Sequence, residues 1–185
     1  MKKTKVSITR EKRTRDYVPE GFISFSDEDM EGIIQLHNDA LVNSILINKS
    51  QVKRILIDPG SSANIICWKV VEQLGLLDQI VPAAWVLNGF KMACETTKGD
   101  ITLPVNTAGI VQHTKFYVMN GEMRYNALFG RPWVHNMREV PSTLHQILKF
   151  LTSEGIKIIH GEQPIAKEIF AVEEATPAPT RTYGR

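Results

Sequence analysis

The stretch that decides the fold is VKRILIDPGSSANII, which runs from Val52 to Ile66. A short apolar run meets an acidic residue, Asp58, and Pro59, Gly60 and Ser61 follow before a second apolar run begins. Asp, Pro, Gly and Ser all favour turns, and a connection from a strand to a helix needs such residues. Taken alone, these four residues indicate a structural turn. The position of Asp58 at the end of an apolar strand leaves a second interpretation open, in which its carboxylate does chemistry.

Short strand-like runs dominate the rest of the chain. Residues 40–47 and 52–57 flank a turn-like Asn48-Lys49-Ser50 and predict a hairpin. A second hairpin is predicted around Ser153-Glu154-Gly155. Further strands are expected at 84–87, 101–105, 115–118 and 127–129. Many short strands with one or two short helices indicate an all-β fold, most simply a small barrel or sandwich.

Two helices are predicted. The first has Ser61 or Ser62 as its N-terminal cap and Gly75 as its C-terminal stop. Apolar residues recur along it with helical spacing, at Ile66, Val70 and Leu74. The second helix is expected to begin at Pro132, because proline suits the first helical turn.

Composition divides the chain into three parts. We expect a basic, flexible lead-in over residues 1–21, a folded domain over 22–172 and a disordered Pro/Thr-rich linker over 173–185. The apolar content of 43% is ordinary for a globular protein. No run of about 18 apolar residues exists, so no membrane span is expected. The charged N-terminus has no apolar stretch behind it, so we expect an intracellular, cytoplasmic protein and not a secreted one.

The net charge of +2 conceals an asymmetry. Residues 1–16 hold seven Lys or Arg and two acidic residues, a net charge of +5, so the remainder carries −3. Such an arm could make weak contacts with nucleic acid through phosphates, or be only a solvated tail. Cys67 and Cys94 form neither a disulfide framework nor a CxxC motif, and we expect buried reduced thiols.

A second motif changes the interpretation of Asp58. About 70 residues later the chain reads Leu128-Phe129-Gly130-Arg131, an apolar strand that ends in glycine before a helix start. Together with VPSTLHQILKF and GEQPIAKE, the two motifs occur in an order and spacing that resemble the aspartic protease region of plant LTR-retrotransposon Gag-Pol polyproteins. The resemblance covers nearly all of the predicted folded segment.

This resemblance implies a retropepsin-like acid protease barrel with one lobe per chain. It implies hydrolysis of peptide bonds in a Gag-Pol-type polyprotein by a homodimer, with Asp58 as the catalytic residue of each subunit. The chain has one Asp-x-Gly in this setting, and a lone carboxylate cannot act as both acid and base. Two adjacent carboxyl groups share one proton, so water can be activated without a cofactor or a metal ion.

The resemblance assigns further residues by position. Pro59, Gly60 and Ser61 complete the active-site loop, and the Ser61 hydroxyl could brace Asp58. Asn88-Gly89-Phe90 falls where the family has a flap, although Asn-Gly is also a plain hairpin turn. Gly130 and Arg131 form a structural strand end, at which Arg131 is expected to pair with an acidic residue.

Pro59 departs from the family pattern. Retropepsins usually carry Thr or Ser there, whose hydroxyl and N–H bond to the partner subunit, and proline has neither group. Up to two hydrogen bonds per subunit are lost, each contributing about 1 kcal/mol. The alternative is therefore an inactive, retroelement-derived binding or dimerisation module. Because the family continues into a reverse transcriptase, we also expect the chain to be a fragment.

Overall fold

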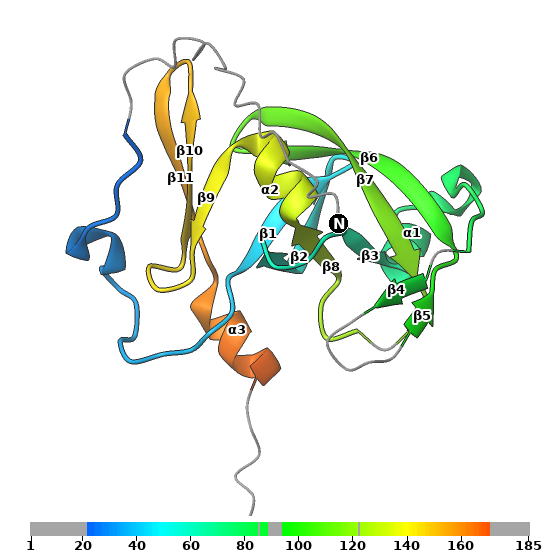
Figure 1. The fold of residues 1–185 in the computed structure, drawn as a ribbon, viewed down its shortest axis with the longest axis horizontal. Helices are drawn as coiled ribbons and strands as arrows, with labels where there is room; N and C mark the ends of the chain where they lie inside the picture. Colours follow the sequence, from blue (N-terminus) through cyan, green and yellow to red (C-terminus); the bar gives the residue numbers. More distant parts are fainter. Residues whose placement is uncertain (1–21, 85, 89–93, 122, 171–185) are drawn as a thin grey trace, which may run out of the picture.

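The computed structural model describes residues 22–84, 86–88, 94–121 and 123–170 (Figure 1). Its strands are β1 (Val42–Ile47), β2 (Ser50–Asp58), β3 (Ile65–Cys67), β4 (Val86–Asn88), β5 (Cys94–Thr96), β6 (Gly99–Thr107), β7 (Ile110–Met119), β8 (Ala127–Gly130), β9 (Glu139–Ser142), β10 (Ile147–Thr152) and β11 (Gly155–His160). Its helices are α1 (Trp68–Gln73), α2 (Arg131–Met137) and α3 (Gln163–Phe170), with 3-10 turns η1 (Asp27–Met30) and η2 (Leu77–Gln79). The expected all-β class is confirmed.

Six strands close a barrel in the order β1-β2-β8-β3-β7-β6. The predicted hairpin of β1 and β2 is confirmed, with Ile47 opposite Ser50. Asn48 and Lys49 both have positive φ, which matches the right-handed twist of the flanking strands. Strand β8 then inserts between β2, to which it is parallel, and β3, to which it is antiparallel.

The first predicted helix is wrong in its N-terminal half. Ile66 lies in strand β3, which pairs with both β7 and β8, and the helix α1 begins only at Trp68. Barrel pairing overrides the helical spacing because β3 can satisfy its backbone groups on both sides. The C-terminal stop is confirmed, since Gly75 follows with φ +70°.

The second predicted helix is confirmed as α2, which begins one residue earlier, at Arg131. Its Trp133 is fully buried and packs edge-on against Phe129 of β8, with ring centroids 4.5 Å apart. Phe129 also contacts Phe116 of β7 at 5.3 Å. This aromatic cluster fixes α2 on the barrel directly after the end of β8.

A second, three-stranded sheet follows α2 in the order β11-β10-β9. The predicted hairpin at its tip is confirmed, with Thr152 opposite Gly155. Figure 1 shows this sheet beside the barrel, with α3 below it. Strands β5 and β9 and helix α3 were not predicted.

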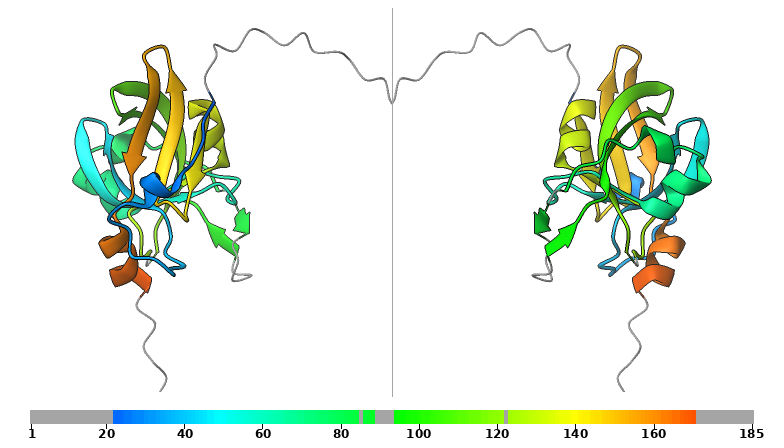
Figure 2. Two further views of the ribbon diagram at one scale, coloured as in Figure 1. Left: turned by 90° about the vertical axis from the view of Figure 1, so that its left-hand side faces the viewer. Right: turned by 90° about the vertical axis from the view of Figure 1, so that its right-hand side faces the viewer.

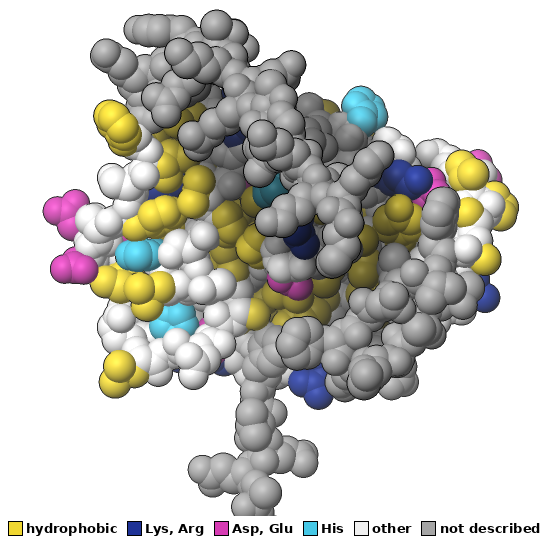
Figure 3. Space-filling model, viewed as in Figure 1, with side chains coloured by type: hydrophobic (Ala, Val, Ile, Leu, Met, Phe, Trp, Pro, Cys, Tyr) yellow, Lys and Arg dark blue, Asp and Glu magenta, His cyan; other side chains and the backbone are white. Residues whose placement is uncertain are grey.

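The N-terminal strap (residues 22–41) lies against this sheet. Lys149 of β10 is almost buried beneath it and contacts Asp29 at 2.7 Å and the Ser24 carbonyl oxygen at 2.9 Å. Gln163 of α3 exchanges two hydrogen bonds with the backbone of Ile34. Figure 3 shows hydrophobic side chains exposed on one face of the molecule. The exposed ones include Phe22, Ile34 and Leu36 of the strap, Leu144 between β9 and β10, and Ile158 of β11.

Candidate active site

Asp58 is the last residue of β2 and lies half-buried beside Gly130, the last residue of β8. Because the two strands are parallel, their carboxyl ends meet at one edge of the barrel. The sequence places the two motifs 72 positions apart, and the fold brings them together. Asp58 therefore lies at a strand end, and Gly130, its neighbour on the paired strand, has no side chain.

The loop after Asp58 folds back on the carboxylate. The Gly60 N–H donates to Asp58 Oδ1 at 2.9 Å, and the Ser61 N–H donates to the Asp58 carbonyl oxygen at 3.1 Å. This hydrogen bond from the loop backbone fixes the rotamer of the Asp58 side chain. The loop thus orients one carboxylate oxygen, and the other makes no hydrogen bond with the described residues.

Ser61 has a different role from the one expected. Its hydroxyl donates to the Ala63 carbonyl oxygen at 3.0 Å, and its Oγ lies 3.4 Å from the Ala63 N–H. The hydroxyl therefore tightens the turn that leads into β3. It is the Gly60 amide, and not the Ser61 hydroxyl, that braces the Asp58 carboxylate.

Arg131 ties the Asp58 loop to α2. Its backbone N–H donates to the Ser61 carbonyl oxygen at 2.8 Å, and its guanidinium Nη2 donates to the Gly60 carbonyl oxygen at 3.2 Å. The expected acidic partner is not observed among the residues that the structure describes. Arg131 instead bonds to carbonyl groups, which connect the loop to α2 without a negative charge beside Asp58.

Gly130 is required by space. A Cβ atom at this position would lie 2.3 Å from the Ala63 carbonyl oxygen and 2.9 Å from that of Ser61. Its φ of −89° is open to any residue, so the constraint is packing and not backbone conformation. The glycine lets β8 and the loop before β3 approach each other closely.

Asn64 is a structural residue of the site that the sequence analysis missed. It is 5% exposed, accepts from the Gly130 N–H at 2.9 Å through Oδ1, and donates to the Lys115 carbonyl oxygen at 3.1 Å through Nδ2. It thereby joins the end of β8 to β7. One signal could have found it: Asn64 is the lone polar residue between Ala63 and the apolar Ile65-Ile66.

Tyr125, also missed, lies just before β8, and the charge of Asp58 affects its pKa. The pKa of its phenol is raised to about 12: burial is the largest cause, the charge of Arg124 lowers the pKa, and the negative charge of Asp58 raises it. An electrostatic effect of this kind requires the phenol to lie within reach of the carboxylate. Tyr125 thus belongs to the surroundings of the site.

The flap candidates are only partly described. Strands β4 and β5 form a hairpin in which Val86 pairs with Thr96 and Asn88 with Cys94. Figure 2 shows this two-stranded sheet projecting from the barrel. Gly89 and Phe90 lie outside the described residues. Their role as a flap tip remains a prediction.

The described part of the chain contains neither a metal-ligand cluster nor a helix that could span a membrane. No group of three or more His, Cys, Asp or Glu residues there could hold a metal ion. Among the same residues, no helix is both long enough and apolar enough to cross a membrane. Cys67 is a buried free thiol, as expected.

Comparisons with known proteins identify the fold. No family model and no curated protein matches the sequence. The retroviral protease-like domain of Ddi1 from Leishmania major matches the structure with a TM-score of 0.53 and 19% identity, covering 66% of this chain and 96% of that domain. The EIAV protease (TM-score 0.45, 12% identity, 60% and 99% covered) and a retropepsin-like aspartic protease from Rickettsia conorii (0.44, 17%, 55% and 75%) match less well. The expected retropepsin-like aspartic protease fold is confirmed.

Proposed function

We propose that this protein is an aspartic endopeptidase that works as a homodimer, with Asp58 of each subunit as the catalytic residue. One observation carries the proposal: Asp58 ends β2 beside the constrained Gly130 of β8, and the Gly60 N–H holds one of its oxygens. A residue that only forms a turn does not need its loop fixed by a second strand, β8, and by the start of helix α2.

The chemistry follows from pairing two such carboxyl groups. Two carboxyl groups in contact cannot both ionise, so the pair holds one proton between them. The ionised Asp58 takes a proton from a water molecule as that water attacks the scissile carbonyl carbon. The protonated Asp58 donates to the oxygen on which negative charge develops. Neither step needs a covalent intermediate.

A second copy of the chain is needed to complete this site. The carboxylate of Asp58 makes no ion pair within the described residues, and only one Asp-x-Gly occurs at a strand end there. Isologous pairing about a two-fold axis would bring two identical loops together. In this arrangement Pro59 lies next to Asp58 in each loop and contributes neither an N–H nor a hydroxyl to the contact.

The same proline favours a second candidate function, an inactive binding or dimerisation module. A loop that lacks those donors forms a weaker dimer, and a monomer holds only half of the site. The two candidates differ in whether the chain cleaves peptide bonds at concentrations at which it associates.

We propose a retrotransposon origin and a Gag-Pol-type polyprotein as the substrate, supported by the order of the motifs from Asp58 to VPSTLHQILKF. An intracellular location is supported by the buried free thiol of Cys67. The arm of residues 1–16 would add weak, salt-dependent contacts with nucleic acid.

The direct test is peptide cleavage at mildly acidic pH and high protein concentration. The wild-type chain is incubated with a peptide library, and the products are identified by mass spectrometry. We expect cleavage by the wild type and by Asp78→Asn, an exposed control, and none by Asp58→Asn. Cleavage that persists in Asp58→Asn would refute the assignment, and an uncut library with the wild type would favour the binding module.

A further inference from the structure

Glu139, the first residue of β9, is buried without a partner. Its side chain is part of a residue only 6% exposed, and neither carboxylate oxygen has a hydrogen-bond partner. Buried carboxyl groups are normally paired, because removing a charge from water is costly. Such a group is stable in the folded protein mainly in its protonated, neutral form.

The position of Glu139 is set by the joint between the barrel and the three-stranded sheet. Helix α2 ends at Met137, Arg138 adopts the left-handed conformation with φ +53°, and β9 starts at the next residue. No loop intervenes that could let the side chain turn outward. Glu139 pairs with the fully buried Phe150 of β10, so its carboxyl group lies on the face of the sheet that belongs to the core.

The surrounding elements offer no cation that neutralises it. Lys149 lies on the opposite face of β10 and is held by Asp29 and Ser24. Lys157 of β11 pairs with Phe150 from the other side, so it lies in the same cross-strand row as Glu139. Its Nζ, however, bonds to the Ala108 carbonyl oxygen and to Glu154. The other charged or titratable side chains of α2, its C-terminal cap and β7 are Arg131, His135, Arg138, His113, Lys115 and the tyrosine Tyr117, which carries no positive charge.

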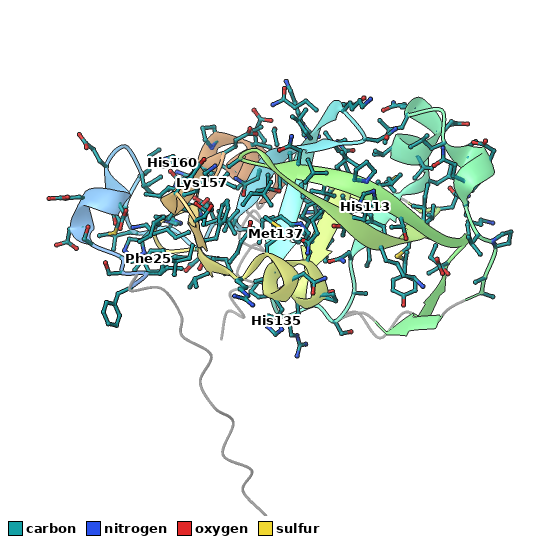
Figure 4. The ribbon with its side chains drawn as sticks, turned by 90° about the horizontal axis from the view of Figure 1, so that it is seen from above. Phe25, His113, His135, Met137, Lys157 and His160 are labelled. Carbon is teal, nitrogen blue, oxygen red and sulfur yellow. The ribbon has the colours of Figure 1, made fainter. Side chains whose placement is uncertain are left out.

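These remaining groups are engaged or point elsewhere. Arg131 donates to Gly60, and Lys115 pairs with Asp100. His135 and Arg138 are exposed, and Figure 4 shows His135 on the outer side of α2, whereas Met137 lies on its inner side. His113 of β7 is exposed as well. No described cation is therefore paired with Glu139.

We propose that Glu139 is a proton-dependent lock, in which the protonated carboxyl group allows α2 and β9 to pack against β10 and its ionisation loosens the three-stranded sheet from the barrel. The role is independent of the chemistry proposed for Asp58. It depends on the burial of an acid at a joint that has no loop.

The direction of the pH dependence follows from the pKa. Burial raises the pKa of Glu139 from 4.5 to about 8. Because the folded-state pKa lies above the unfolded-state value, the stability that this proton confers is fully present below pH 4.5. It declines as the pH rises and is lost once the pH passes 8. Between pH 6 and pH 9 the unfolding constant should increase roughly 100-fold through this one group.

The test compares the full chain with Glu139→Gln, which keeps the shape of the side chain and cannot ionise, and with the exposed control Glu72→Gln. Urea unfolding is measured from pH 6 to pH 9. The wild type and Glu72→Gln should lose stability over this range. The factor by which the unfolding constant rises should be roughly 100-fold smaller in Glu139→Gln than in the wild type. Equal pH dependence in all three proteins would overturn the proposal.

Two further measurements are made. The first locates the effect in the structure, and the second still tests the proposal if Glu139→Gln fails to fold. Hydrogen exchange at pH 9 should be faster in β9 and β10 of the wild type than in Glu139→Gln, and equal rates would contradict a lock at this joint. Carbon NMR of the wild type labelled at the glutamate carboxyl groups needs no variant. One glutamate should titrate near pH 8, and titration of every folded-state glutamate below pH 6 would also overturn the proposal.

Discussion

Gly130 lies so close to Ala63 that a Cβ atom on Gly130 would fall 2.3 Å from the Ala63 carbonyl oxygen. This contact joins the end of β8 to the loop that follows Asp58. The next residue, Arg131, reinforces the joint, since its N–H and its guanidinium donate to carbonyl oxygens of the same loop. The position of the Asp58 carboxylate thus depends on backbone contacts made by its neighbours.

Gly130→Ala should therefore destabilise the fold by about 3 kcal/mol, since backbone and not a flexible side chain must move. Gly109→Ala is the control: Gly109 has φ +91° and open space around it, so the cost there is conformational and about 1 kcal/mol. Denaturant unfolding measures both. A Gly130→Ala protein no less stable than Gly109→Ala would show that the close approach is not required.

Asn64→Ala should cost about 3 kcal/mol, because the change leaves the buried Gly130 N–H and the Lys115 carbonyl oxygen without their partner. Asn38→Ala, at an exposed asparagine, should change the free energy of unfolding by less than about 0.5 kcal/mol. Denaturant titration of the two variants separates the outcomes. Similar small losses in both would remove Asn64 from the support of the site.

The strap contact has its own pH dependence. The hydrogen bond with Lys149 and the Ser26 backbone N–H hold the pKa of Asp29 below 3.8. A lowered pKa stabilises the fold above pH 3.8 and loses that effect as the pH falls through the folded-state value. Asp29→Asn should lower the thermal unfolding midpoint at pH 6, and the difference from the wild type should shrink below pH 3. The exposed neighbour Asp27→Asn should leave the midpoint unchanged at both pH values.

Pro59→Thr should strengthen self-association at least tenfold, because it restores an N–H and a hydroxyl to each loop, and each new hydrogen bond contributes about 1 kcal/mol. Sedimentation velocity over a concentration series gives the dissociation constant. Pro59→Ala restores only the N–H, so its dissociation constant should lie between those of the wild type and Pro59→Thr. An unchanged constant in both variants would place this loop outside the dimer contact.

The features predicted correctly from the sequence are those set locally. The hairpin at Asn48-Lys49 follows from turn residues that tolerate positive φ, and the start of α2 follows from Pro132. The barrel was predicted from the family resemblance, which rests on the Asp58 and Gly130 motifs together with VPSTLHQILKF and GEQPIAKE. Each of these features is carried by residues that are close together or by a motif that occurs as a unit.

The features that were missed depend on contacts across the fold. Ile66 has helical spacing with Val70, yet pairing on both sides makes it part of β3. The bonds of Asn64 and Arg131 reach segments about 50 to 70 residues away, so no local pattern indicates their partners. The burial of Glu139 likewise arises only when α2 and β10 close around it.

The central claim, that two copies of Asp58 form one catalytic site, is tested most directly by mixing chains. A fixed amount of wild type, at a concentration well above the dissociation constant of the dimer, is incubated with a ninefold excess of Asp58→Asn, and peptide cleavage per wild-type chain is measured. Random pairing leaves about one tenth of the wild-type chains with an active partner, so cleavage should fall to about one tenth. An equal excess of Asp58→Asn that left cleavage per wild-type chain unchanged would show that a single Asp58 suffices, and would contradict the account.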